Sequence, residues 1–294
     1  MTTETVTPVA GETPLGPGPS MRKKKRPLTA TLSAAWLGLL VVLIVVRPLL
    51  GLPDPNISDY AAVGAKPFTP GHILGTDLVG RDILARLIAG AKVSLSVGIG
   101  AVIVGTLVGA PLGIVAGYFG GWADRVLGGL VDVLLAFPPL IATIALTVFL
   151  GASLSTLILA IGIVFTPQLA RVARAATLTF AKRDFVAAAK GTGAGNVRVL
   201  VREIIPNTVA PILAYATVMV AIGITAEAGI SFLGLGVPPP QSSWGTMMGE
   251  DRSALSTNPH IVLIPAVTMA LTLLALSFLS EHLGRRFDIK EAVL

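Results

Sequence analysis

Cysteine is absent from this chain of 294 residues, so neither a disulfide nor a thiolate metal site can form. Charged residues are also scarce. They make up 13% of the chain, whereas a soluble domain of this size carries about 25%. Hydrophobic residues make up 53%, and the mean hydropathy is +0.80. A water-soluble core of this length cannot bury so much apolar surface, and the composition therefore indicates an integral membrane protein.

The chain also lacks the glycine patterns that bind nucleotide phosphates. A phosphate-binding loop needs G-x-x-x-x-G-K-[ST], and no Gly-Lys pair occurs in the sequence. Gly191, Gly193 and Gly195 follow a helical pattern and do not have the G-x-G-x-x-G spacing of a dinucleotide site. The chain therefore has no recognisable nucleotide-binding site of its own.

Long apolar runs predict six membrane-spanning helices. Residues 1–27 are rich in Thr, Pro and Gly and end in a basic run, which predicts a disordered cytoplasmic tail. The apolar run that follows, over 28–51, lacks a small-residue cleavage site, so it is predicted to be a retained first span and not a secretory signal. A helix needs about 20 apolar residues to cross the hydrocarbon core. Five more stretches qualify, over 93–118, 127–150, 153–170, 208–234 and 261–280.

The distribution of Lys and Arg sets the predicted orientation. With the amino terminus inside, sixteen of the 22 basic residues fall on cytoplasmic segments and six on outer ones. The net charge of +6 therefore points to a membrane surface and not to nucleic acid. We predict cytoplasmic termini in a multi-pass protein of the plasma (inner) membrane. An extracytoplasmic segment over 52–92 and a five-helix core over 93–285 would precede a short tail over 286–294.

Glycines spaced along the predicted second span permit close helix–helix contact. They lie between residues 98 and 117.

A cytoplasmic hairpin is predicted over 184–206. Asp184 is expected to cap a short helix that ends at Gly193, since glycine tolerates a left-handed turn. Asn196 is expected to cap the next helix, and Pro206 to stop it. An apolar stripe at helical spacing marks that second helix and consists of Val197, Leu200, Val201 and Ile204. Two interpretations stay open, a hairpin resting on the lipid surface and a docking element for a cytoplasmic partner.

This hairpin resembles the Glu-Ala-Ala loop of binding-protein-dependent ABC transporter permeases. The family's spacing of triplet, glycine and proline is matched by Ala187-Ala188-Ala189, Gly193 and Pro206. The sequence departs from the pattern at Ala187, where the family has glutamate, and at Glu203, where it often has His or Ile. The resemblance implies that residues 184–206 receive motion from an ATPase. The residues that it places in this coupling role are Asp184, Ala187, Ala188, Ala189, Gly193, Asn196, Val197, Leu200, Val201 and Pro206.

Three further stretches resemble the dipeptide/oligopeptide permease C-subunits and extend the match to about residues 28–285. They are 72–98, 113–138 and 227–248. The resemblance implies an all-α, MetI-like type I importer permease without catalytic, cofactor or metal residues. Its expected partners are a second homologous permease, two cytoplasmic ATPase subunits (or one fused protein), an extracytoplasmic solute-binding protein and membrane lipid. The expected cargo is a di- or oligopeptide, and glutathione or a nickel complex is the alternative.

Isolated polar residues allow other interpretations. Glu227 lies in an apolar span, where an ionisable group is a candidate functional site, although a structural hydrogen bond to a neighbouring helix is the favoured interpretation. Asp132 is expected to pair with Arg125 or another basic group at the membrane surface.

His72, Asp77 and Asp82 could be interpreted as ligands of a hard metal ion. Their spacing in the sequence does not support such a site. Helix capping or ion pairing with Arg81 and Arg86 is the simpler interpretation of these acidic residues.

Two rival classes, a membrane-embedded enzyme and a secondary transporter, find little support. The enzyme needs paired catalytic groups within its spans, and the sequence contains no H-E-x-x-H motif. The transporter would show carboxylates at the midplane and inverted repeats, and Glu227 alone is weak support for it.

Overall fold

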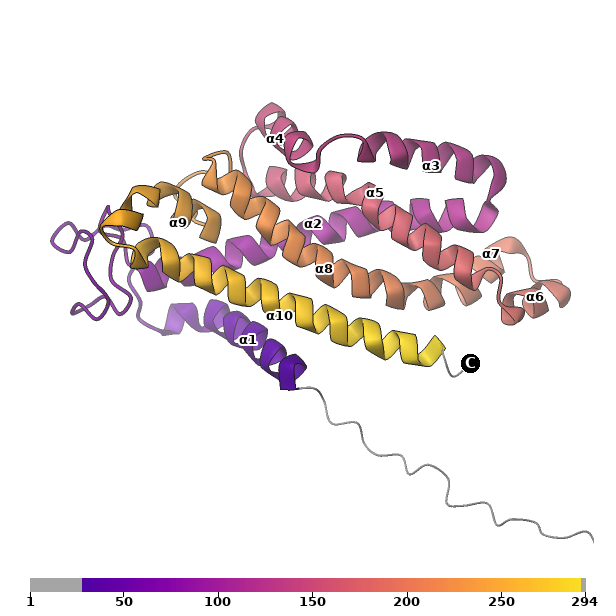
Figure 1. Ribbon diagram of the computed structural model, residues 1–294, viewed down its shortest axis with the longest axis horizontal. Coiled ribbons are helices and arrows are strands. Elements are labelled where there is room, and N and C mark those ends of the chain that lie inside the picture. The colour runs from indigo at the N-terminus through magenta and orange to yellow at the C-terminus, as the bar shows by residue number, and fades with distance from the viewer. Residues whose placement is uncertain (1–27, 292–294) are drawn as a thin grey trace, which may run out of the picture.

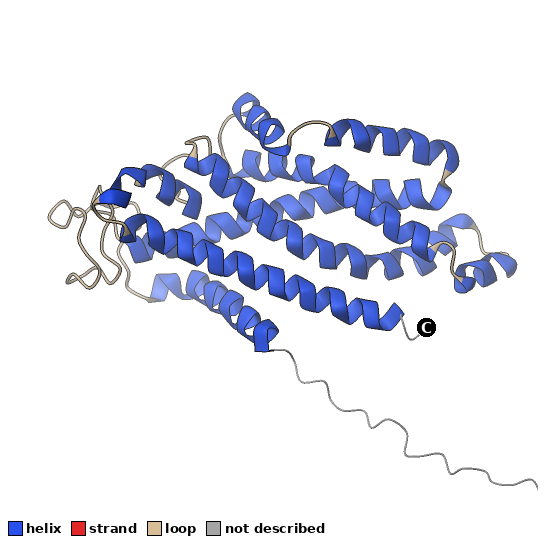
Figure 2. Ribbon diagram, in the orientation of Figure 1, coloured by secondary structure: helices blue, strands red, loops and turns tan. Residues whose placement is uncertain are grey.

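Long helices running side by side dominate the computed structural model, which describes residues 28–291 and side chains as far as residue 284. In that part of the chain, the named secondary-structure elements are all helical, and loops connect them (Figure 2). The helices are α1 (Leu28–Val46), α2 (Ile83–Phe119), α3 (Gly121–Leu135), α4 (Pro139–Leu150), α5 (Leu154–Phe180), α6 (Asp184–Gly191), α7 (Asn196–Val199), α8 (Ile205–Phe232), α9 (Trp244–Glu250) and α10 (His260–Glu291). Short helical turns are η1 (Arg47–Leu49), η2 (Leu200–Ile204) and η3 (Arg252–Ser256).

The predicted all-α membrane fold is confirmed. Five helices within the described residues are long and apolar enough to cross a membrane, and α3 with α4 makes a sixth span if the two are counted together. The sequence predicted a span over 127–150, and the structure breaks this stretch between α3 and α4. The two helices meet at an angle of 84°. Pro138 and Pro139 lie at the break, and a proline disfavours the helical conformation of the residue before it.

Several helices are longer than their apolar runs. α2 begins at Ile83 and not near residue 93, because Asp82 accepts a hydrogen bond from the Ala85 N–H (2.7 Å) and caps the helix there. α5 continues to Phe180 beyond the predicted end at 170, with Pro167 inside the helix. α10 likewise runs on to Glu291, so the chain between 286 and 291 is helical and not an irregular tail. Hydropathy therefore locates the spans, but it misses the more polar ends of the helices.

The α2–α5 pair forms the centre of the molecule, and glycines on α2 make the contact possible. A Cβ atom at Gly109 or Gly113 would press into the carbonyl oxygens of Thr166 or Ala170, far inside contact distance. The predicted close approach of this glycine stripe is thereby confirmed.

The two ends of the molecule differ in character (Figure 1). The loop over 50–82 and α9 gather at one end, whereas α6 and α7 project at the other. α1 lies along α10, where Trp36 Nε1 donates a hydrogen bond to Thr272 Oγ1 (3.1 Å). The predicted disordered tail over 1–27 lies outside the described residues, as does 292–294.

Candidate functional site

The hairpin over 184–206 is a closed turn between two short helices. α6 ends at Gly191, and Gly193, two residues further on, has a left-handed conformation (φ 83°). The Gly193 N–H donates to Lys190 O (3.0 Å) and the Ala194 N–H donates to Ala189 O (3.1 Å), which satisfies the last carbonyl groups of α6. The predicted turn at Gly193 is therefore confirmed, and its geometry fixes how α7 leaves α6.

The predicted ends of the hairpin helices are wrong in three places. Asp184 is the first residue of α6, whose N-cap is Arg183, and it makes no capping hydrogen bond. Asn196 is likewise inside α7, whose N-cap is Gly195. Pro206 does not stop the second helix. It lies directly after the π-helical turn η2, near the start of α8, and the helix from Asn196 runs unbroken to Phe232.

Tyr118, at the inner end of α2, contacts both arms of the hairpin. Its hydroxyl donates a hydrogen bond to Asn196 Oδ1 (3.1 Å) on α7. The ammonium of Lys190 on α6 lies over its ring, 5.2 Å from the centroid. Sequence reasoning missed this residue because an aromatic at the end of an apolar run is also typical of a membrane interface.

The predicted apolar stripe of α7 and η2 divides into two faces. Ile204 is fully buried and Leu200 partly so, and both pack with Val199, which the stripe did not include. Val197 and Val201, by contrast, are 75% and 55% exposed. The inner face thus joins the hairpin to the bundle and the outer face stays uncovered.

The exposed valines belong to a larger surface of the hairpin. They line a shallow hollow together with Arg198 and Arg202. On α6, the first two alanines of the triplet, Ala187 and Ala188, are exposed as well, and Ala189 is half-buried. Small apolar groups flanked by guanidinium groups therefore cover the side of the hairpin that faces away from the spans.

Glu227 lies fully buried in α8 and is held by two hydroxyl groups. Ser231 Oγ donates to Glu227 Oε1 (2.6 Å), and Ser94 Oγ of α2 donates to Glu227 Oε2 (3.0 Å). Ser94 Oγ in turn accepts the Trp244 N–H at the start of α9 (3.3 Å). The favoured structural interpretation agrees with these contacts, since the carboxyl group ties together α2, α8 and α9. Ser231 stands four residues from Glu227, which is the one sequence signal for this cluster.

We expect Glu227→Leu to destabilise the fold, because the hydroxyl groups of Ser94 and Ser231 would be left buried without their partner. Each unsatisfied buried group costs about 1–3 kcal/mol. The thermal unfolding temperature of the detergent-purified protein measures the effect. Glu227→Gln is the control, since an amide keeps the shape and can bond both hydroxyl groups. Equal stability of wild type and Glu227→Leu would show that the cluster does not hold the helices.

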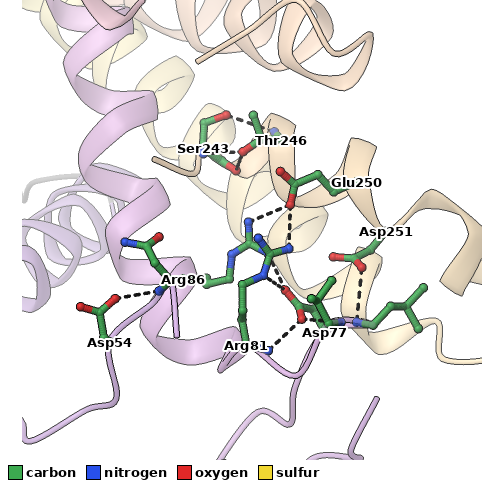
Figure 3. A network of polar contacts seen from close by, with 11 residues as sticks. Asp54, Asp77, Arg81, Arg86, Ser243, Thr246, Glu250 and Asp251 are labelled. Atoms are coloured by element: carbon green, nitrogen blue, oxygen red, sulfur yellow. Dashed lines mark hydrogen bonds and ion pairs between the residues drawn. The ribbon is translucent and has the colours of Figure 1, made fainter. Parts of the chain in front are cut away.

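Arginine–carboxylate pairs hold the outer loop against the helices (Figure 3). Asp77 accepts hydrogen bonds from Arg81 Nε (2.6 Å) and from Arg86 Nη1 (2.5 Å), and both guanidinium groups also donate to Glu250 Oε2 (2.8 and 3.0 Å). Burial opposes the ionisation of Asp77, but the Arg81 N–H and the two guanidinium charges outweigh it and hold its pKa below the ordinary value. The predicted pairing with Arg81 and Arg86 is confirmed, and it fastens the loop to α9.

His72 makes a second tie within the same loop. Its Nδ1 lies 2.9 Å from Asp82 Oδ2, and its Nε2 lies 3.5 Å from Asp59 Oδ2. The hydrogen bond with Asp82 raises the pKa of His72, with a smaller contribution from Asp59, although burial acts in the other direction. Asp82 thus caps α2 and holds His72 at once, which accounts for both residues as structural groups.

A charged cavity of about 320 Å³ lies between α2, α3 and α5 in the inner half of the bundle. Arg174 of α5 makes a two-pronged ion pair with Asp124 of α3. One turn away along α5, Arg171 Nη2 donates to Asp132 Oδ1 (2.7 Å), so Asp132 pairs with Arg171 and not with Arg125. The sequence analysis did not predict these two ion pairs. The available signal was two arginines, Arg171 and Arg174, directly after the apolar run over 153–170.

Comparisons with known proteins agree with one another. Residues 109–289 match the family model described as "Binding-protein-dependent transport system inner membrane component". A glutathione transport system permease protein of Pectobacterium atrosepticum is 35% identical over 86% of this chain and 85% of its own length. One of Escherichia coli is 36% identical over 92% of this chain and 88% of its own length.

Solved structures of the MetNI methionine ABC transporter in inward-facing conformations resemble the fold. In one of them the similar chain gives a TM-score of 0.59 at 17% identity, covering 70% of this chain and 97% of that one. At this identity the likeness shows the fold alone, and it confirms the expected MetI-like architecture.

Proposed function

This chain belongs to the family of binding-protein-dependent transport system inner membrane components, and it is a multi-pass permease subunit of an ABC importer. From that premise we propose that it forms one half of a translocation path and that ATP hydrolysis in partner subunits drives it through the hairpin over 184–206. Membership in the family implies ATPase and binding-protein partners. We propose two ATPase subunits, or one fused protein, with a second homologous permease.

The observation that carries the coupling role is the divided surface of the hairpin. Val199 and Ile204 anchor it to the bundle, whereas Val197 and Val201 remain exposed beside Arg198 and Arg202. Exposed apolar side chains on a well-anchored element mark a surface that binds another protein. Because α5 and α8 enter and leave this hairpin, a partner that grips it would move two spans together.

Polar cargo needs a path lined by polar groups, because each unsatisfied amide in hydrocarbon costs several kcal/mol. The ion pairs Arg174–Asp124 and Arg171–Asp132 supply charged groups at the cavity between α2, α3 and α5, just beyond the apolar run over 153–170. Charged side chains around a cavity can contact polar cargo that hydrocarbon would exclude. We therefore place one part of the cargo route along this cavity.

The proposed cargo is glutathione. The names of the relatives favour this alternative over the wider class of di- and oligopeptides, which stays the second candidate, with nickel complexes third. Glutathione is itself a tripeptide with two carboxylates, so the first two candidates share their chemistry. Competition of labelled glutathione uptake by unlabelled dipeptides and nickel complexes, in cells with the complete transporter, ranks the three.

A double substitution on the exposed face, Val197→Asp/Val201→Asp, tests the coupling surface. We expect ATPase subunits to co-purify at least about tenfold less with this variant, because burying a valine contributes about 1.5–3 kcal/mol and a buried carboxylate is costly. Uptake should fall in proportion.

The matched control is Thr179→Asp, which adds an acidic group to an exposed position in the last turn of α5, outside the hairpin. It should retain both the ATPase subunits and uptake. If the hairpin only rests on lipid, the double variant will bring down as much ATPase as wild type, and the coupling role will be wrong.

A further inference from the structure

A second cavity, of about 380 Å³, lies at the outer end of the bundle and has no part in the transport role described above. It opens where α1 passes into η1, and the outer part of α2 forms its opposite wall. Segment 240–242, just before α9, closes it from above. Its volume falls within the range of about 300–1,000 Å³ that is typical of small-molecule sites.

Two positive charges face this cavity without a negative one. Arg47 of η1 and Lys92 of α2 line it, and no aspartate or glutamate does. Neither side chain forms an ion pair with any described residue. Asp54, in the adjoining loop, has Oδ1 engaged by the backbone N–H of Asn56 (2.8 Å). The cavity is therefore an uncompensated cationic site, unlike the inner cavity, whose arginines are paired.

Buried polar atoms in the same cavity also lack partners. Ser242 is 3% exposed, and its Oγ has no hydrogen-bond partner. The Nε of Arg47 is likewise buried and unpaired. The neighbouring Ser243 caps α9 through Thr246, so the segment is well ordered around the free hydroxyl. Both atoms are covered within the cavity wall, and an unsatisfied buried group costs about 1–3 kcal/mol, so each would gain from an acceptor that reached it.

The remaining walls are polar toward the loop and apolar toward the spans. Asn56 and Gln241 offer amide groups on the outer side, whereas Ile44, Ile88 and Val93 form the floor. A ligand that fits both the polar and the apolar walls has an anionic headgroup and a hydrocarbon chain.

We propose that this cavity binds the phosphate headgroup of an anionic phospholipid from the outer leaflet. Arg47 directly follows the apolar run of α1, and so it stands at the level where headgroups meet hydrocarbon. Guanidinium and ammonium groups bind phosphate oxygens through charge-assisted hydrogen bonds.

The placement of Arg47 and Lys92 on the predicted outer side of the membrane also supports a lipid headgroup as the ligand. Basic residues are disfavoured on the outer ends of membrane helices, yet two of the few outer basic residues of this chain converge on one hollow. Anionic lipid attracts such residues at the membrane surface and offsets that cost. The acyl chains would lie along the exposed face of α1, where Val41, Val42 and Val45 are uncovered.

Native mass spectrometry of the full-length protein, released from nanodiscs of phosphatidylglycerol or of phosphatidylcholine, tests the proposal. We expect a one-to-one adduct with phosphatidylglycerol that survives release, and at least about a tenfold smaller bound fraction for Arg47→Gln/Lys92→Gln. The matched control is Lys66→Gln/Arg252→Gln, which removes two charges from the same side of the membrane but outside this cavity. It should bind as wild type does.

Three results would overturn the lipid assignment. They are an adduct equally abundant with phosphatidylcholine, an adduct undiminished in the double variant, and displacement of the lipid by millimolar inorganic phosphate. The last would assign the site to a soluble anion. If the double variant does not fold, Lys92→Gln alone replaces it, because the side chain of Lys92 is exposed and makes no described contact. None of these outcomes depends on ATPase coupling.

Discussion

Replacing Gly193 with valine is expected to abolish uptake while leaving the chain inserted and stable. Gly193 has φ 83°, a conformation that costs an L-residue about 1–2 kcal/mol and that a β-branched residue hardly adopts. A Cβ there meets no atom within 4 Å, so the change does not disturb the bundle. It alters the turn itself, which redirects α7 relative to α6 and breaks the shared surface of the two arms.

Uptake of labelled cargo, with the membrane-inserted amount measured by immunoblot, checks this prediction. Gly195→Val is the matched control, because Gly195 lies two residues away in an ordinary extended conformation (φ −69°, ψ 159°) with open space around it. We expect the control to keep most of its uptake. Wild-type uptake in Gly193→Val would show that the hairpin's angle does not matter for transport.

Replacing Gly113 with leucine is expected to prevent folding altogether. A Cβ at Gly113 would overlap the Ala170 carbonyl oxygen and would lie 2.8 Å from the Arg174 nitrogen. These are backbone atoms, so α2 and α5 would have to separate along their whole contact. The loss exceeds the cost of ordinary overpacking, which is about 1–3 kcal/mol.

The fraction of protein that elutes as a single peak on size-exclusion in mild detergent measures this loss. Gly38→Leu is the control, since a Cβ added at Gly38 of α1 would meet no atom within 4 Å and the position should accept the larger side chain. A normal elution profile for Gly113→Leu would mean that the helix pair is much looser than its geometry indicates.

The sequence predicts those parts of the fold that follow from local chemistry. Apolar runs locate the spans, glycines spaced along α2 mark its close contact with α5, and Gly193 marks a left-handed turn. Each of these signals is carried by one residue type whose physical role hardly depends on its neighbours. The same holds for Asp77, whose flanking arginines predicted its ion pairs.

Features set by tertiary contact could not be predicted in this way. Asn196 and Asp184 suit helix caps, but each helix begins one residue earlier, and the chain passes through Pro206 as a continuous helix. The partner of Asp132 lies on α5, far away in sequence, and no spacing rule reaches it.

The chain is one continuous helix from α7 through η2 into α8, so a rotation at one end displaces the other end. The helix from Asn196 to Phe232 has 37 residues and so is about 55 Å long. Tilting a rod of that length by about 5° around one end moves its other end by roughly 5 Å. A small rotation of the hairpin would therefore produce a larger displacement beside Glu227 and α9, at the other end of the helix.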